Sequence, residues 1–352
     1  GILEEDAASY EGLKDGSVYS YDFIKDKIYS LEIHPSTLGL APCSGSMVIT
    51  DPNNGNVLAC VTYPGYDNNR LANQMDTAYY SKLSSDLSRP FYNKATQQKT
   101  APGSTFKIVT AIAGMQEGII NDDYYINCTG AFNLIQPSPH CWNLSGHGVL
   151  GVQSAIKESC NIFFYNVAYD MARDEKNNFS DSLGLSKLQK YAKLFQLDEK
   201  SGLELSEAQP EISNEDVIRS AIGQGTHNYT TAQLARYVTT IANRGTSYSL
   251  SLLDKVTDSK GNVLNDFTSE VINTMDIPDY EWDIVQAGMR EVVQNNEAFS
   301  DLDFPVSGKT GTAEIAENGK YLEEKYIYSF AGMYPKDDPE YIIYGMIKKP
   351  NN

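Results

Sequence analysis

The β-rich segments of this 352-residue chain form two groups near its opposite ends, and this separation constrains the fold. Residues 46–51 and 56–64 are joined by the turn-forming sequence PNNG and predict a β-hairpin. Three more strands are predicted near the C-terminus, at residues 305–315, 326–335 and 341–350. Helical patterns lie between the two groups, at residues 104–118, 151–172 and 230–245. We therefore predict an α+β fold, in which a five-stranded antiparallel sheet is flanked by helices and accompanied by a helical subdomain.

The charge balance argues against one class of partner. With 46 acidic and 28 basic residues, the chain has a net charge of -18. Nucleic-acid binding depends on Lys and Arg side chains that neutralise phosphates, so we expect no nucleic-acid partner. An anionic substrate would need a local cationic pocket set against this overall field. The sequence contains no run of about 18 or more apolar residues that would predict a membrane span.

The N-terminal residues 1–42 are polar, rich in tyrosine and poorly periodic. We expect them to be a small remnant of an upstream segment, and the main domain to span residues 43–352. The chain opens without an initiator Met or an apolar leader, as a piece of a longer protein does.

Ser104 and Lys107 form an S-x-x-K sequence directly after a Pro-Gly turn. Residues three apart on a helix share a face, so the two side chains can lie within hydrogen-bond reach. The apolar segment after Ser104 can bury Lys107, and burial favours the uncharged amine that a general base requires. The alternative is an ordinary N-cap serine followed by a surface lysine, because S-x-x-K alone is common.

Two further motifs follow along the chain. Ser159 and Asn161 form an S-x-N sequence between two amphipathic segments. The predicted strand 305–315 contains the consecutive residues Lys309, Thr310, Gly311 and Thr312. A lysine with hydroxyls at alternate strand positions is suited to a carboxylate, and glycine in a strand allows close approach of a ligand or backbone. Each motif alone is weak, but all three in this order are difficult to obtain by chance.

The set S-x-x-K, S-x-N and K-T-G resembles the motifs of penicillin-binding proteins and serine β-lactamases, and so implies their fold. The resemblance covers roughly residues 43–350. It includes MVITDPNNGNVLACVTYPGYDNN, NKATQQKTAPGSTFKIVTA, AIGQGTHNYTTAQLARYVTTIANRG and VSGKTGTAE, which look like a class B penicillin-binding protein, the monofunctional D,D-transpeptidase type. Residues 126–172 are most similar to elongation-type and sporulation-type members.

The resemblance implies a serine acyl-enzyme mechanism that cross-links peptidoglycan. Ser104 would attack the penultimate D-Ala carbonyl of a stem peptide, with Lys107 as its base. Ser159 would relay a proton to the leaving amine, and Asn161 would bind the substrate amide and steady Lys107. A second stem peptide would then supply the amine that resolves the acyl-enzyme.

The strand motif is implied to bind the terminal carboxylate, through Lys309, Thr310 and Thr312 with Gly311 between the two threonines. The backbone N–H groups of Ser104 and Thr312 would form the oxyanion hole. β-Lactams resemble the end of the stem peptide and would acylate the same serine. GQG at residues 223–225 matches a transpeptidase loop and is expected near the floor of the cleft.

Cys128, Cys141, His147 and Cys160 have the spacing C-x12-C-x5-H-x12-C. Three thiolates and one imidazole can hold a structural zinc ion, which would fix the S-x-N motif from behind because Cys160 lies within it. Acyl transfer itself would need no cofactor.

Several alternatives to this zinc site stay open at the level of the sequence. Cys128 and Cys141 can pair as a disulfide, or all three cysteines can be buried free thiols. His140 is the alternative imidazole ligand. Cys43 and Cys60 lie on the first hairpin and are expected to be unconnected to the cluster.

The family resemblance implies more chain than is present here. Residues 1–42 would be the remnant of an N-terminal pedestal or linker, and the final helix of the domain is expected to be missing after IKKPNN. A membrane anchor upstream would place the domain on the extracytoplasmic face of the bacterial cell membrane. The expected partners are peptidoglycan stem peptides, β-lactams and a wall-synthesis glycosyltransferase.

Two other functions are alternatives to the predicted transpeptidase. A serine β-lactamase or a penicillin-sensing domain uses the same acylation chemistry, and a β-lactamase differs by rapid deacylation with water. A catalytically silent scaffold with structural zinc is the rival from another class. The acceptor amine and the choice between vegetative elongation and sporulation are left open by the sequence.

Overall fold

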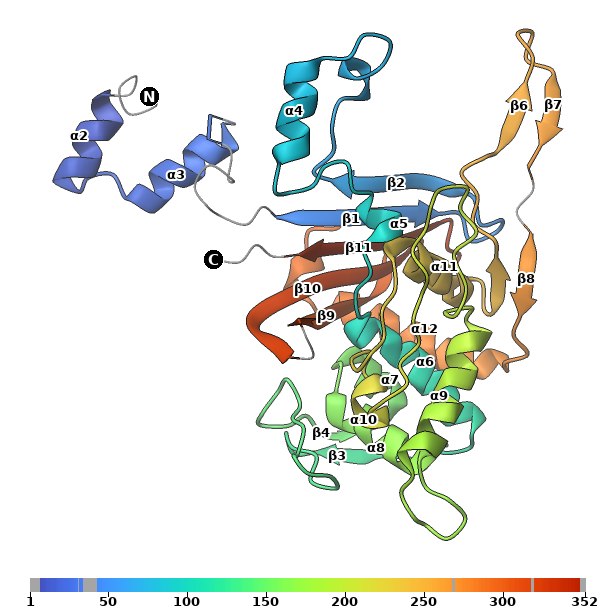
Figure 1. The fold of residues 1–352 in the computed structure, drawn as a ribbon. Coiled ribbons are helices and arrows are strands. Elements are labelled where there is room, and N and C mark those ends of the chain that lie inside the picture. Colours follow the sequence, from blue (N-terminus) through green and yellow to red (C-terminus); the bar gives the residue numbers. More distant parts are fainter. Residues whose placement is uncertain (1–6, 31, 34–42, 268–269, 318–319, 349–352) are drawn as a thin grey trace. The chain divides into compact units, whose positions relative to one another are not determined.

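The computed structural model describes residues 7–30, 32–33, 43–267, 270–317 and 320–348 (Figure 1). The chain divides into two compact units. The smaller unit consists of residues 1–44, 64–91 and 349–352, and the larger one of residues 45–63 and 92–348. All of the predicted site residues lie in the larger unit.

The smaller unit takes its helices from two separate parts of the sequence. Its described elements are α2 (Ala7–Asp15), α3 (Ser20–Tyr29), the 3-10 helix η2 (Asn68–Arg70) and α4 (Thr77–Ser85). Asp76 caps α4 because its carboxylate accepts a hydrogen bond from the Tyr79 N–H at 3.0 Å. The predicted boundary between residues 42 and 43 adjoins a segment outside the described residues, and the final helix expected to be missing after IKKPNN would follow another such segment, so both stay predictions.

The predicted five-stranded sheet is confirmed, and it joins strands from both ends of the chain. Its order is β2 (Val57–Tyr63), β1 (Ser44–Thr50), β11 (Tyr341–Lys348), β10 (Lys320–Tyr334) and β9 (Ser307–Glu317). The pairs β1–β2, β10–β11 and β9–β10 are antiparallel. Because β9 is at the edge of the sheet, the K-T-G-T motif lies on a strand with one unpaired side.

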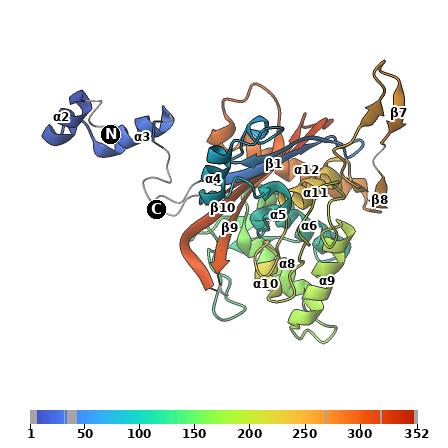
Figure 2. The same cartoon turned by 45° about the horizontal axis from the view of Figure 1, so that its top comes forward.

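The helices of the larger unit include the S-x-x-K segment. They are α5 (Lys94–Gln97), η3 (Gly103–Phe106), α6 (Lys107–Gln116), α7 (Val152–Lys157), α8 (Asn161–Met171), α9 (Asp181–Leu194), α10 (Val217–Ser220), α11 (Thr231–Ala242), α12 (Asp279–Gln294) and η4 (Glu297–Phe299). Nine of the ten residues of α6 are buried, as expected for a helix that is apolar nearly all round. Figures 1 and 2 show α6 next to α8 and α9, away from the sheet.

Helix α11 covers the sheet and begins where the sequence predicts a helix. Thr230 and Gln233 form a capping box, in which the Thr230 hydroxyl accepts the Gln233 N–H and the Gln233 side chain accepts the Thr230 N–H. All twelve residues of α11 are buried, and the helix packs against β10 and β11. It therefore lies between the sheet and the helical layer.

Three short strand pairs complete the larger unit. They are β3 (Ile126–Cys128) with β4 (Gly148–Leu150), β5 (Thr246–Tyr248) with β8 (Val271–Thr274), and β6 (Lys255–Thr257) with β7 (Val263–Asp266). Among the described residues, no helix is both long enough and apolar enough to cross a lipid bilayer.

Candidate active site

Ser104 lies in η3, immediately before α6 begins at Lys107. The Lys107 N–H donates to the Ser104 carbonyl, so one tight helical turn joins the two residues. Ser104 is half-buried, whereas Lys107 has no exposed surface. The predicted helix over 104–118 thus forms in two parts, and its first turn carries the serine.

The side-chain amine of Lys107 is held by the S-x-N motif, which lies 52 residues further along the chain. Lys107 Nζ donates to the Ser159 carbonyl at 2.7 Å and to Asn161 Oδ1 at 2.7 Å. It also lies 3.2 Å from the Ser159 hydroxyl oxygen. These contacts fix the lysine amine beside both polar residues of the motif.

The S-x-N motif forms the joint between α7 and α8. The predicted helix over 151–172 breaks here because Ser159 has a φ of 50°, a left-handed conformation that non-glycine residues rarely adopt. Cys160 follows with an extended backbone and is completely buried, whereas Ser159 and Asn161 are half-buried. The turn therefore directs alternate side chains of the motif to different environments.

Lys309 on β9 completes a three-residue arrangement. Its amine donates to the Ser159 hydroxyl at 2.9 Å and to the Thr310 carbonyl at 3.0 Å. The Ser159 hydroxyl thus lies between two buried lysines that are 202 residues apart in the sequence (309 − 107). This arrangement suits the transfer of protons between groups.

Three close backbone approaches bring β9 and the GQG loop to the serine. Gly103 has a φ of 56°, and a Cβ there would lie 2.5 Å from the Thr312 carbonyl oxygen. The Gly103 N–H donates to the Gly223 carbonyl at 3.0 Å. A Cβ at Gly223 would in turn lie 2.1 Å from the Gly103 carbonyl oxygen. The serine segment therefore lies against both the K-T-G-T strand and the GQG loop, and only glycines allow this.

Burial changes the protonation of both lysines. Desolvation lowers the pKa of Lys107 to about 7, although negative charge on the nearby Cys160 and Cys141 sulfurs acts in the opposite direction. Desolvation, assisted by the charge of Lys107, also holds the pKa of Lys309 well below its usual value. At neutral pH a large fraction of Lys107 is therefore uncharged and able to accept a proton.

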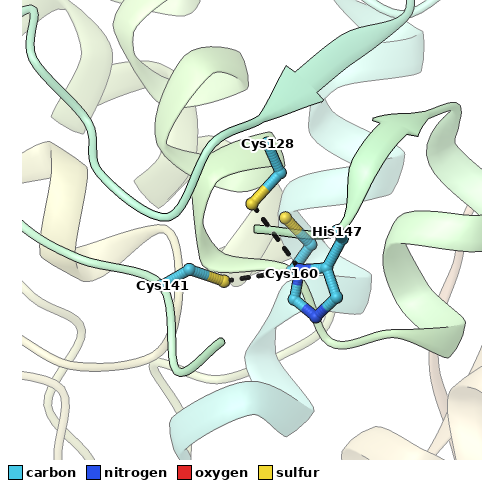
Figure 3. Close-up of side chains that lie close together, drawn as sticks. All are labelled: Cys128, Cys141, His147 and Cys160. Atoms are coloured by element: carbon cyan, nitrogen blue, oxygen red, sulfur yellow. Dashed lines mark hydrogen bonds between the residues drawn. The ribbon is translucent and has the colours of Figure 1, made fainter. Parts of the chain in front are cut away.

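The four predicted metal ligands converge behind the motif, as Figure 3 shows. The candidate ligand atoms of Cys128, Cys141, His147 and Cys160 all lie within 4.8 Å of one another. His147 Nδ1 is 3.6 Å from the sulfur of Cys128 and 3.6 Å from that of Cys141. All three of these cysteines are buried.

The geometry decides between two pairs of alternatives for this cluster: a disulfide or separate cysteines, and His140 or His147. Cys128, Cys141 and Cys160 are not joined by any disulfide, so the predicted Cys128–Cys141 pairing is not formed. The imidazole of His147 belongs to the cluster, whereas that of His140 does not and His140 is exposed. The backbone carbonyl of His140 instead accepts a hydrogen bond from Asn161 Nδ2 at 3.4 Å. A hydrogen bond shared with Cys160 lowers the pKa of the Cys141 thiol.

Some residues that hold the serine segment were not identified from the sequence. The Tyr237 hydroxyl on α11 donates to the Thr105 carbonyl at 2.9 Å. The His227 ring lies 4.1 Å from the Phe106 ring, and burial lowers the pKa of His227 to about 3, so this imidazole is neutral. Both residues lie in the segment 221–245 that resembles the family, but the apolar pattern of this segment predicts only that they are buried in the core.

Comparisons with known proteins agree with this geometry. The family model described as "Penicillin binding protein transpeptidase domain" matches residues 45–352. Peptidoglycan D,D-transpeptidase MrdA from Haemophilus influenzae is 29% identical over 340 residues, which cover 86% of this chain and 50% of the relative. Stage V sporulation protein D from Bacillus subtilis is 26% identical over 363 residues, covering 99% of this chain and 52% of that protein.

A solved structure shows the same fold. The ceftriaxone acyl-enzyme complex of penicillin-binding protein A from M. tuberculosis superposes with a TM-score of 0.75 and 19% identity, covering 87% of this chain and 68% of that one. The present chain spans about half the length of the curated relatives it matches. The resemblance to class B penicillin-binding proteins is confirmed, and this chain belongs to the family of penicillin-binding protein transpeptidase domains.

Proposed function

We propose that this chain is a peptidoglycan D,D-transpeptidase domain that cross-links stem peptides and is acylated by β-lactams. The observation that carries this proposal is the hydrogen-bonded chain from Lys107 through the Ser159 hydroxyl to Lys309, beside the segment of Ser104. The name of the Haemophilus influenzae relative, a peptidoglycan D,D-transpeptidase, supports the same reaction.

In the proposed reaction the Ser104 hydroxyl is the nucleophile and uncharged Lys107 takes its proton. The oxygen of Ser104 bonds to the penultimate D-Ala carbonyl carbon, and the bond from that carbon to the terminal D-Ala nitrogen breaks. The Ser159 hydroxyl passes a proton to the leaving amine. An amine of a second stem peptide then displaces Ser104 and forms the cross-link.

The edge strand β9 binds the donor in this proposal. Lys309, Thr310 and Thr312 bind the terminal carboxylate, for which an amine and two hydroxyls are suitable hydrogen-bond donors. Backbone N–H groups of Ser104 and Thr312 stabilise the oxyanion, because Gly103 allows these segments to approach closely. Gly311 serves a similar purpose, since a Cβ there would lie 3.0 Å from the Pro102 carbonyl oxygen. Asn161 binds the acyl amide while its Oδ1 accepts from Lys107.

We also propose that the cysteine and histidine cluster holds a structural zinc ion. With Zn–S bonds of about 2.3 Å and Zn–N bonds of about 2.0 Å, tetrahedral angles separate sulfur and nitrogen by about 3.5 Å. The two S···N distances of 3.6 Å fit this requirement. Zinc would supply a rigid cross-link among Cys128, Cys141, His147 and Cys160, while buried free thiols are the alternative.

The position of the ligands relates the cluster to the reaction. Cys160 lies between Ser159 and Asn161, so a fixed Cys160 sulfur holds the backbone of both residues. Because Lys107 Nζ donates its hydrogen bonds to these two residues, an ordered Cys160 helps to position the proposed base. This is a positioning role, and no metal enters the acyl transfer.

The cellular setting is proposed from family membership. A peptidoglycan transpeptidase acts where its substrate lies, which places the domain on the extracytoplasmic face of the bacterial membrane, held there by an upstream anchor. A wall-synthesis glycosyltransferase is the proposed partner of the full-length protein. The net charge of -18 makes nucleic acid an unsuitable partner, so none is proposed.

The decisive experiment is intact mass measurement after exposure to benzylpenicillin. We expect wild-type protein to gain the mass of one β-lactam and to keep it for hours, and Ser104→Ala protein to gain none. Loss of the adduct within minutes would instead indicate a β-lactamase. Failure of the wild-type protein to form any adduct would support the silent scaffold.

A further inference from the structure

Trp142 is a large aromatic residue that is both exposed and held in place. Its side chain is 63% exposed, yet its indole N–H donates to the Glu158 carbonyl at 3.0 Å. Its ring packs edge-on against the His147 ring, with the two ring centroids 5.1 Å apart. An exposed tryptophan that is anchored on two sides presents a fixed apolar face at little entropic cost.

Trp142 belongs to a short segment, residues 140–142, that runs along the S-x-N motif. The His140 carbonyl accepts from Asn161 Nδ2, and Cys141 lies in the cluster beside Cys160. Trp142 is bonded to the carbonyl of the residue immediately before Ser159. The segment is therefore attached to the motif at three successive points.

The orientation of a bound donor stem peptide follows from the positions of Lys309 and Asn161 at the two ends of the site. If Lys309 takes the terminal carboxylate, the leaving group lies on the β9 side. The acyl group must then extend from Ser104 toward Asn161, whose Nδ2 points to the His140 carbonyl. A side chain carried by the acyl amide consequently lies next to residues 140–142.

We propose that Trp142 forms a subsite for the acyl side chain of the donor and favours apolar or aromatic groups there. This inference rests on the proposed function. A ring that only packed on the cluster would be expected to be buried like Cys141, which is 2% exposed. Stacking of an aromatic ligand on the indole adds affinity beyond the buried area.

The test compares two penicillins that differ only in this side chain. Benzylpenicillin carries a benzyl group, and acetamidopenicillanic acid carries a methyl group on the same amide. Second-order acylation rate constants are measured for both compounds on wild type and on three variants: Trp142→Ala, Trp142→Phe and Leu144→Ala. Leu144 is the matched control, because it is 73% exposed in the same loop.

We expect Trp142→Ala to reduce the preference for benzylpenicillin over the methyl analogue by about tenfold, the size of one good aromatic contact. Trp142→Phe should restore most of the preference, and Leu144→Ala should leave it unchanged. A ratio of two rate constants on one sample does not depend on the fraction of folded protein. Partial unfolding of a variant therefore cannot imitate the result.

Two outcomes would overturn the inference. If Trp142→Ala slows both compounds equally, the tryptophan only supports the S-x-N motif. If neither rate constant changes, the acyl side chain does not reach it. In both cases the wild-type protein is still acylated, whereas failure of the proposed function would appear as wild-type protein that reacts with neither compound.

Discussion

At the scale of single residues, the environment of Lys107 decides the proposed chemistry. An ordinary lysine is protonated at neutral pH and cannot accept a proton from serine. Complete burial lowers the pKa of Lys107 to about 7, and Asn161 and Ser159 supply oriented acceptors for its N–H groups. Desolvation therefore makes the uncharged form of Lys107 available as a base, while the hydrogen bonds fix the position of its amine.

This pKa predicts a pH dependence of acylation. Only the uncharged form of Lys107 accepts the proton, and its fraction increases as the pH rises through about 7. We expect the rate constant for benzylpenicillin acylation to rise from about pH 5.5 and to level off above about pH 8. Mass spectrometry of samples quenched at successive times, at each pH in this range, gives the profile of the rate constant.

Lys107→Arg is the control for this prediction, because the guanidinium stays charged at every pH in the range. It should lower the rate constant by at least about 100-fold and remove the rise with pH. A wild-type profile that is flat between about pH 6 and 8 would contradict the assignment of Lys107 as the base.

At the scale of elements, the site depends on how closely η3 approaches β9. A Cβ at Gly103 would lie 2.5 Å from a backbone oxygen of Thr312, which cannot move without displacing the strand. We expect Gly103→Ala to lower the acylation rate constant by at least about 100-fold, because the two proposed oxyanion donors would separate. The measurement is the second-order rate constant with benzylpenicillin.

Gly118 provides the matched control at the end of α6. Gly103 and Gly118 have φ values of 56° and 69°, but a Cβ at Gly118 would meet nothing within 4 Å. Gly118→Ala should therefore cost only the strain of the left-handed conformation, about 1–2 kcal/mol in the free energy of unfolding, and leave acylation unchanged. Equal acylation rates for the two variants would show that backbone approach at Gly103 is unimportant.

At the scale of the whole molecule, the cysteine cluster connects the β3–β4 pair to the joint between α7 and α8. Cys128 ends β3, His147 directly precedes β4, and Cys160 precedes α8. A zinc ion there would cross-link segments that are up to 32 residues apart (160 − 128). Such a cross-link stabilises the folded state because the unfolded chain has no preformed site.

We predict that purified protein contains about one zinc ion per chain and that a strong chelator lowers its Tm by at least about 5 °C. Acylation should slow at the same time, because the hydrogen-bond acceptors of Lys107 lose their support. Metal analysis and thermal unfolding give the two readouts.

Cys141→Ser should reproduce the loss of metal, and Cys43→Ser should not, since Cys43 lies outside the cluster and is exposed. Protein that contains no metal after purification in zinc-supplemented medium, with Tm unaffected by chelation, would indicate three buried free thiols instead.

The sequence determined those features that depend on short separations along the chain. The S-x-x-K spacing puts Ser104 and Lys107 on one helical turn, the PNNG turn pairs β1 with β2, and alternation on β9 sets the positions of Thr310 and Thr312. The order of the three motifs indicated penicillin-binding proteins or serine β-lactamases, and longer similar segments narrowed this to the class B type. Three cysteines and a histidine, with Cys160 inside the S-x-N motif, suggested a metal site.

Only the tertiary structure decided contacts between distant segments. Ser159 meets Lys309 across 150 residues of sequence, and Gly103 meets Gly223 across 120 (223 − 103). The choice of His147 over His140, and the anchoring of Trp142 next to Ser159, depend in the same way on how the loop 129–147 folds over α7 and α8. Local spacing fixes a side chain only relative to its own element, whereas these contacts depend on how whole elements pack, which no short segment encodes.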